Sequence, residues 1–147
     1  THMDFDIGLA KQKTNKNPVY YVQYAHARIN SVLRKISETF PDELDFKKPL
    51  KNFDFSKIEF KNDSERGLAV TLLLYPDVIY SACSSNATYF VTQYLYRLAT
   101  DFHHFYSHNI IMGKTKVNKS RLALAILAKT VIKNGLTIIG VSAPLKM

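Results

Sequence analysis

One stretch decides the fold of this chain, and it reads Asn17-Pro18-Val19-Tyr20-Tyr21-Val22-Gln23-Tyr24-Ala25-His26-Ala27-Arg28-Ile29. Asn17 is a favoured helix N-cap, and a proline in the first helical position loses no hydrogen bond there, so a helix begins at Pro18. Pro41 predicts that this helix ends near Glu38. Five apolar residues recur at steps of three or four and predict a buried stripe: Val22, Ala25, Ile29, Val32 and Ile36. Tyr21, Tyr24 and Arg28 share another face, so the helix docks on a core and also presents a surface for a second contact.

Working outward, the rest of the chain reads as further helices. We predict a short helix over residues 68–73, a second one over 76–83 that Pro76 separates from it, and a long one over 87–106 capped within Ser84–Asn86. The long helix carries an apolar stripe of Val91, Leu95, Leu98, Phe102 and Phe105. Asn118 or Ser120 caps the last helix, which Asn134-Gly135 ends or loosens and Gly140 stops.

Residues 40–63 show no sustained period and predict a long connection with some local structure. Four to six helices with almost no alternating strand pattern predict an all-α helical bundle.

Composition limits the classes of protein. The 147 residues, 46% of them hydrophobic, predict one domain with its own core. We expect no membrane span, because no run of about 18 uncharged apolar residues occurs, and no signal peptide. Thr1-His2-Met3 reads as a scar left by tag removal. Cys83 is the only cysteine, which excludes an internal disulfide, fits a reducing cytoplasmic setting, and is interpreted as an ordinary buried thiol.

Positive charge is segregated toward one end of the chain. The formal net charge is +8, and no acidic residue follows Asp101. Seven basic residues do follow it: Lys114, Lys116, Lys119, Arg121, Lys129, Lys133 and Lys146. Such segregation favours a polyanionic partner, although a solvated lysine face that keeps the protein soluble explains it equally well.

Catalytic patterns are scarce. No glycine-rich phosphate loop occurs. His104 and His108 would lie one helical turn apart, a spacing that can hold a metal ion, but the accompanying glutamate pattern is absent. We therefore predict no metal site and rank a metal-dependent enzyme last among the functions considered. His26 lies between alanines and reads as a hydrogen-bonded histidine, not as a general base.

Aromatic and basic residues are more informative. The chain has nine tyrosines, and unpaired bases stack on aromatic rings while nearby arginine or lysine holds phosphates. Tyr21, Tyr24, Arg28 and Tyr106, with the basic last helix, form a candidate RNA platform. Two alternatives stay open: the tyrosines edge the core with their hydroxyls in water, or the chain is a helical protein-interaction module that docks on a partner domain.

Three segments carry a family resemblance. Asn17 to Arg28 closely resembles the junction motif of bacterial arginyl-tRNA synthetases. Tyr94-Leu95-Tyr96-Arg97-Leu98-Ala99 with Phe102-His103-His104-Phe105-Tyr106 resembles the central helix of their C-terminal domain. Ser120-Arg121-Leu122-Ala123-Leu124 and the ending Gly140-Val141-Ser142-Ala143-Pro144-Leu145-Lys146-Met147 are similar to the family's last helix and terminus. Residues 40–63 depart from the family pattern.

The resemblance implies the all-α DALR anticodon-binding domain of this class I synthetase. Residues 4–16 would then be the end of the catalytic core and a connecting loop, and residues 17–147 the anticodon-binding helical domain. The family attaches arginine to its tRNA with ATP and magnesium. Because the His-Ile-Gly-His and Lys-Met-Ser-Lys-Ser type motifs are absent, we expect this fragment to be catalytically silent and to hold no cofactor itself.

The resemblance also implies site residues and partners. Tyr21, Tyr24 and Arg28 match positions that face the anticodon stem-loop, and Tyr106 and Met147 match positions that meet its splayed bases. We add four lysines as tRNA contacts: Lys13, Lys16, Lys114 and Lys116. Arg121 is assigned equally to an intradomain salt bridge or helix-start contact and to a phosphate contact. The implied partners are arginine tRNA and the parent catalytic domain, with no membrane and a monomeric state.

Overall fold

In the residues that the structure describes, the chain folds mainly into α-helices. The computed structural model describes residues 6–14, 16–44 and 53–147. Its elements are α1 Ile7–Lys11, α2 Pro18–Thr39, the 3-10 turn η1 Phe55–Lys57, α3 Asp63–Leu73, α4 Tyr75–Ser84, α5 Tyr89–His108 and α6 Lys119–Ile138. Within these described ranges the only β pairing is an isolated bridge between Met112 and Val117. The predicted all-α bundle is therefore confirmed.

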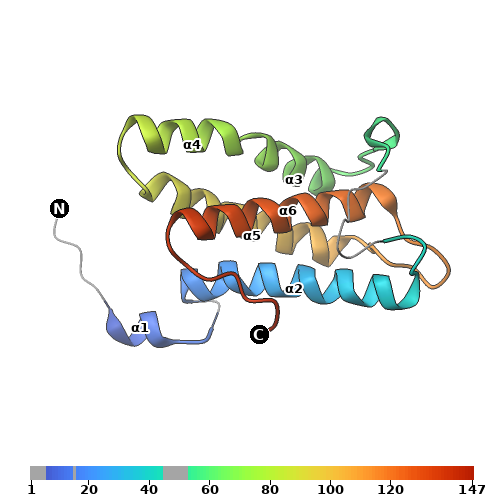
Figure 1. Cartoon of the computed structure of the whole chain (residues 1–147), viewed down its shortest axis with the longest axis horizontal. Coiled ribbons are helices and arrows are strands. Elements are labelled where there is room, and N and C mark those ends of the chain that lie inside the picture. The colour runs from blue at the N-terminus through green and yellow to red at the C-terminus, as the bar shows by residue number, and fades with distance from the viewer. Residues whose placement is uncertain (1–5, 15, 45–52) are drawn as a thin grey trace.

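The long helices form the body of the bundle (Figure 1). α5 and α6 contact each other, and both contact α2 on one side and α3 on the other. α4 contacts α5 and its neighbour α3. The helices α3 and α4 therefore form one layer, on the opposite side of the bundle from α2. This arrangement gives the domain two separate outer surfaces, one on α2 and one on the α3–α4 layer.

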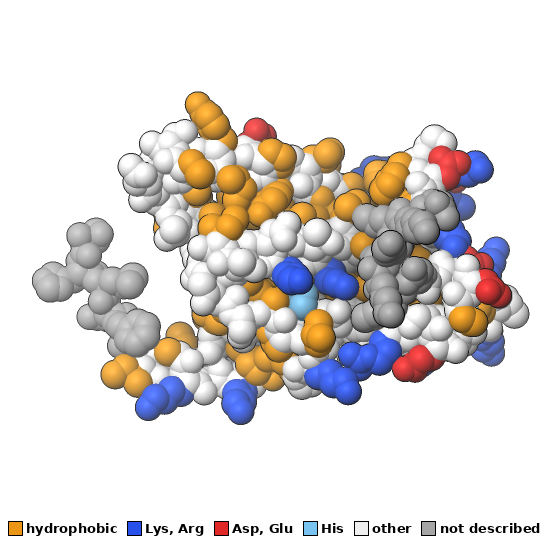
Figure 2. All heavy atoms as spheres, viewed as in Figure 1, with side chains coloured by type: hydrophobic (Ala, Val, Ile, Leu, Met, Phe, Trp, Pro, Cys, Tyr) orange, Lys and Arg blue, Asp and Glu red, His pale blue; other side chains and the backbone are white. Residues whose placement is uncertain are grey.

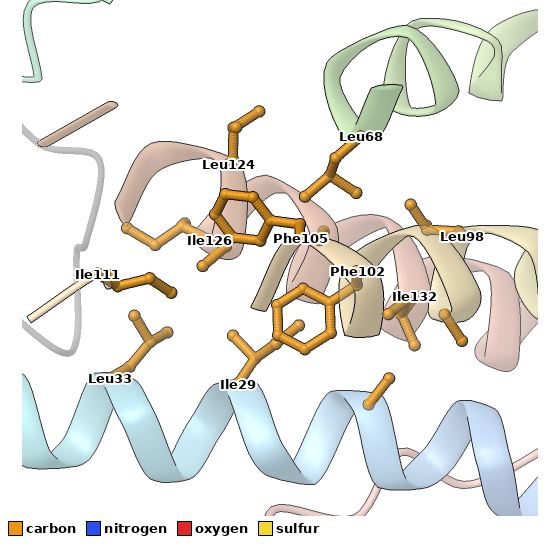
Figure 3. Close-up of a cluster of buried hydrophobic side chains, with 14 of the residues drawn as sticks. Ile29, Leu33, Leu68, Leu98, Phe102, Phe105, Ile111, Leu124, Ile126 and Ile132 are labelled. Carbon is orange, nitrogen blue, oxygen red and sulfur yellow. The ribbon is translucent and has the colours of Figure 1, made fainter. Parts of the chain in front are cut away.

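The core lies where α2, α5 and α6 meet (Figure 3). The predicted α5 stripe is buried at all five positions, and Phe102 and Phe105 are its largest members. On α2, Leu33 is buried and Val32 only partly so, because the buried stripe takes a four-residue step from Ile29 to Leu33 and a three-residue step to Ile36. The predicted limits of α2 agree with Pro18–Thr39, and Asn17 caps it by accepting from the backbone N–H groups of Val19 and Tyr20.

The last helix differs from its predicted form at one glycine. Of the two proposed caps, Asn118 is the one used, since its side chain accepts the N–H of Arg121. α6 then continues through Asn134-Gly135 without a break. A Cβ atom on Gly135 would lie 2.6 Å from Leu95 Cδ2, so this glycine permits close approach of α6 to α5. Gly140, with φ +72°, ends the segment as predicted.

The connection before α3 lies partly outside the described residues, because residues 45–52 are not among them. Its described part contains η1, which agrees with the prediction of local structure within 40–63. α3 begins with a cap that sequence reasoning missed: Asn62 accepts the N–H of Glu65, and the Glu65 carboxylate accepts the N–H of Lys61.

Two predictions near α4 are wrong. Cys83 is exposed, because it falls on the outer side of α4 while Val78, Ile79 and Ala82 face the core. Ser84–Asn86 do not cap α5, whose N-cap is Thr88 without a side-chain cap bond. Asn86 instead adopts φ 48°, a left-handed conformation that asparagine tolerates in turns, and the chain reverses there.

The α3–α4 layer has a further property that the sequence prediction did not anticipate. Among the described residues, Asp63–Ser84 is long and apolar enough to cross a membrane by length and composition alone. Pro76 interrupts its backbone hydrogen bonds and Asp77 lies near its centre. The stretch therefore stands out by its exposed apolar surface.

Candidate nucleic-acid interface

Four predicted residues from two helices meet on one surface. The Arg28 guanidinium lies over two rings, with its central carbon 5.6 Å from the Tyr24 centroid and 4.5 Å from that of Tyr106. Arg28 Nη1 also donates to the Tyr24 hydroxyl at 3.2 Å. Tyr21 lies beside this group and contacts Tyr96 at 5.3 Å between centroids. We call Tyr21, Tyr24, Arg28 and Tyr106, with His103, the aromatic platform.

The sequence analysis did not single out one member of the platform. The ring centroid of His103 lies 4.9 Å from that of Tyr21 and 5.6 Å from that of Tyr24. Its Nε2 is buried without a hydrogen-bond partner. Tyr96, His103 and Tyr106 are spaced by seven and three residues, which puts them on one face of α5. That spacing is a signal that could have placed His103 beside α2.

His103 is neutral at physiological pH. Burial and, to a smaller extent, the nearby Arg28 charge lower its pKa to about 4, although a hydrogen bond to the Tyr21 backbone opposes the shift. A neutral imidazole avoids a second positive charge next to Arg28. The platform can therefore present the Arg28 cation and several ring faces together.

The C-terminal tail is fastened along α2. Gln23 Nε2 donates to the Ser142 carbonyl at 2.8 Å, and His26 Nδ1 lies 2.8 Å from the Pro144 carbonyl oxygen. His26 is thus a hydrogen-bonded histidine, as predicted. Burial lowers its pKa, and Lys129 and Lys133 add to that effect against the Pro144 hydrogen bond.

The fastened tail brings Met147 to the start of α2. A pocket of about 500 Å³ is lined there by Met147, Lys13, Tyr20 and Gln23, among others. Met147 is 52% exposed, so its side chain is available to a ligand. Lys16 is exposed near the same end of α2. Lysine and arginine side chains gather along this α1–α2 edge in Figure 2.

Tyr106 opens onto a second pocket. It has a volume of about 320 Å³ and is lined by Val32, Lys35, Tyr106 and Asn109 together with residues 110–112. Lys35 was not among the predicted site residues, although its position seven residues after Arg28 on α2 gives it the same helix face. The pocket offers apolar walls with one cation at the rim, which suits a base next to a phosphate.

The remaining predicted cations lie elsewhere. Lys114 and Lys116 are exposed in the loop between α5 and α6, and Lys116 lines a separate groove of about 420 Å³ with Lys57, Lys61 and others. Arg121 makes the intradomain contact: its Nε lies 2.7 Å from Glu65 Oε1, and Nη1 donates to the Ile110 carbonyl. The structure therefore uses Arg121 to hold α6 to α3.

The paired histidines do not extend to a metal cluster in the part of the chain that the structure describes. The rings of His104 and His108 lie 4.4 Å apart. No group of three or more His, Cys, Asp or Glu residues gathers in residues 6–14, 16–44 and 53–147.

Known proteins are similar to this chain in both sequence and fold. A model of the DALR anticodon binding domain matches residues 22–147. Curated arginine–tRNA ligases are similar along the whole chain: one from Listeria monocytogenes is 43% identical and one from Desulforudis audaxviator 38%, each over 100% of this chain and 25% of the relative.

Solved structures agree. One from Campylobacter jejuni, provisionally assigned as an arginyl-tRNA synthetase, has a TM-score of 0.77 and 32% identity over 100% of this chain and 30% of that one. The Thermus thermophilus arginyl-tRNA synthetase has a TM-score of 0.70 and 25% identity over 99% of this chain and 24% of that one. The chain spans about a quarter of the length of the curated relatives it matches. It belongs to the DALR anticodon-binding domain family of the arginine–tRNA ligases.

Proposed function

We propose that this chain recognises the anticodon arm of arginine tRNA on behalf of a longer arginine–tRNA ligase. The observation that carries the proposal is the Arg28 guanidinium between the rings of Tyr24 and Tyr106. Stacked rings next to a fixed cation suit splayed bases and their phosphates, because each base presents a π-face and each linkage a negative charge.

Each predicted residue has a role in this proposal. Tyr21, Tyr24 and Tyr106 stack on bases, and Met147 meets a base at the pocket beside Lys13. Arg28, Lys13 and Lys16 hold backbone phosphates near the platform. Lys114 and Lys116 reach the RNA at the other end of the domain, where the α5–α6 loop lies.

The chemistry belongs to the rest of the parent enzyme. There, arginine is attached to tRNA with ATP and magnesium, and the catalytic domain is the partner of this one. We propose that the isolated domain is inactive, because the family's His-Ile-Gly-His and Lys-Met-Ser-Lys-Ser type motifs do not occur in its sequence. A cytoplasmic location and a monomeric state complete the proposal, supported by the cytosolic nature of translation and the single cysteine.

Binding to a labelled anticodon stem-loop of arginine tRNA tests the function. By fluorescence anisotropy at low salt, Tyr106→Ala should raise the Kd about tenfold, since one stacked base contributes about 1–3 kcal/mol. Tyr80→Ala is the matched control, because Tyr80 is an exposed tyrosine on α4, in the layer opposite α2. Equal binding to stem-loops of other tRNAs, with no effect of Tyr106→Ala, would refute the proposal.

The protein-interaction alternative keeps one specific observation in its favour, the exposed apolar surface of α3 and α4. It does not compete with RNA binding, because the two surfaces lie on different layers of the bundle.

A further inference from the structure

An apolar stripe runs along the outside of α3 and α4. Its members follow one another at helical spacing: Gly67, Val70, Leu73, Pro76, Tyr80 and Cys83. Val70 is 54% exposed, Leu73 76% and Tyr80 74%. Leu74 links the two helices in a helical conformation, and its N–H bonds to the carbonyls of Val70 and Thr71, so the stripe is nearly continuous. We call these six residues the outer stripe.

The fold does not need the outer stripe. α3 buries Leu68 and Thr71 against α5 and α6, and α4 turns Val78, Ile79 and Ala82 toward the core. The layer is thus anchored by its inner face alone. Hydrophobic side chains nonetheless cover much of the α4 edge in Figure 2. Large contiguous apolar patches are uncommon on soluble monomers and mark surfaces that another molecule covers.

RNA is a poor fit for this surface. The outer stripe contains no lysine or arginine, and the only charged residue from Gly67 to Ser84 is Asp77. A phosphate backbone requires cations, which the chain supplies instead on the α1–α2 edge. The complementary surface on a partner would be apolar and would carry a positive group opposite Asp77. A carboxylate that a partner covers must form an ion pair.

We propose that the outer stripe is the surface on which the rest of the parent polypeptide packs. The chain covers 25% of its arginine–tRNA ligase relatives, so three quarters of such a protein lie outside it. A covalently linked partner has a high effective concentration, so a stripe of this size suffices without the larger area that a dimer of separate copies requires. Leu73 and Tyr80 insert into an apolar face of the catalytic part, and Asp77 meets a lysine or arginine there. The proposal rests on family membership and not on the RNA-binding function.

The sole cysteine provides a probe. Cys83 ends the outer stripe and is exposed in this domain. In the full-length enzyme, its reaction with a maleimide should be at least tenfold slower than that of a thiol introduced by Thr137→Cys, an exposed position on α6. Peptide mass spectrometry measures the labelling of each thiol. The labelling rate of each thiol in the folded protein is then divided by the labelling rate of the same thiol in urea. Equal normalised rates would overturn the proposal.

A second variant separates an interface from local shielding. Tyr80→Asp leaves the inner face of α4 untouched, and in the full-length enzyme it should restore rapid labelling of Cys83, whereas Thr137→Asp should not. Two other outcomes would also overturn the proposal. Protection that rises with protein concentration would mean a second copy, and protection only with added anionic lipid vesicles would mean a membrane. Anticodon stem-loop binding by the same preparations is expected to stay normal, so failure of this interface is distinguishable from failure of RNA recognition.

Discussion

The guanidinium of Arg28 lies 4.5 Å from the ring centroid of Tyr106, which joins a cation of α2 to an aromatic ring of α5. The contact fixes the direction in which the charge points, because Tyr24 covers its other side at 5.6 Å. In the tRNA-binding surface that we propose, the position of this charge therefore matters as well as its presence.

Arg28→Ala should therefore weaken anticodon stem-loop binding more than the loss of one positive charge elsewhere on the domain does. We expect a rise in Kd of about tenfold or more, and a smaller rise for Arg28→Lys, whose ammonium does not stack on rings as guanidinium does. Arg97→Ala, which removes an exposed arginine paired with Asp101, should change Kd less than about twofold. Similar losses for both alanine variants would show that net charge alone governs binding.

Acidification should destabilise the domain through His103. Its pKa is about 4 in the folded state and about 6.5 in the unfolded chain, so between these pH values the unfolded chain binds a proton that the folded one does not. The contribution of His103 to the free energy of unfolding is therefore fully present above pH 6.5. It falls by about 1–2 kcal/mol as the pH approaches 4, once solvent screening is allowed for. His26, whose pKa is also lowered, acts in the same direction.

The test is thermal unfolding followed by circular dichroism between pH 7.5 and 5. His103→Phe should reduce the pH dependence of Tm, and its loss of stability at pH 7.5 should be limited to the hydrogen bond with the Tyr21 backbone, because Nε2 has no partner. His104→Phe, at an exposed position, should retain the full pH dependence. An unchanged profile in His103→Phe would contradict the assignment.

Two glycines should respond in opposite ways to alanine. A Cβ on Gly135 meets buried Leu95 at 2.6–3.1 Å, so Gly135→Ala should lower the free energy of unfolding by about 1–2 kcal/mol. Nothing lies within 4 Å of a Cβ on Gly67 in α3, so Gly67→Ala should raise it by about 0.5–1 kcal/mol. Urea unfolding measures both, and a stabilised Gly135→Ala would mean that α5 and α6 separate at little cost.

The tail should loosen when its hydrogen bond to α2 is removed. His26→Leu leaves the Pro144 carbonyl without its partner, which costs about 1–3 kcal/mol and should release Met147 and Lys146 to carboxypeptidase at least fivefold faster. His104→Leu serves as the exposed control. Unchanged release from His26→Leu would show that other contacts hold the tail.

Arg121 offers a stability test of its structural role. Its partner Glu65 has a side chain only 2% exposed, so Arg121→Ala strands a buried carboxylate and should lower the free energy of unfolding by about 3 kcal/mol. Arg66→Ala breaks only the exposed pair with Asp63 and should change it by less than about 1 kcal/mol. A small effect of Arg121→Ala in urea unfolding would return this residue to the candidates for phosphate contact.

Local patterns were sufficient to predict most of the helices. Asn17-Pro18 marked the start of α2 because capping involves only neighbouring residues, and Pro76 marked the α3–α4 break because proline removes a donor within its own helix. The stripe from Val91 to Phe105 identified the buried face of α5 through period alone. The N-cap of α5 was not predicted, because Thr88 makes no side-chain hydrogen bond that a sequence pattern could indicate.

Residues that share a face of one helix could be grouped from the sequence, whereas a grouping across two helices could not. Tyr21, Tyr24 and Arg28 share a face of α2, and their grouping follows from spacing. The placement of His103 between those tyrosines depends on how α5 is rotated against α2, which spacing within α5 does not determine. Cys83 was misplaced for the same reason, since only the docking of α4 decides which of its sides is covered.

By itself, the sequence determined an all-α fold, the main helices and, through its motifs, the family, because helix period, caps and motif residues are properties of neighbouring positions. Only the tertiary structure decided that Arg28 lies between two tyrosines, that His26 holds the tail carrying Met147, and that Gly135 lets α6 approach Leu95. These contacts join residues that are far apart in the chain, and their geometry depends on the relative rotation and spacing of packed helices. That rotation is set by the whole core at once, because its side chains must interlock at close to crystalline density.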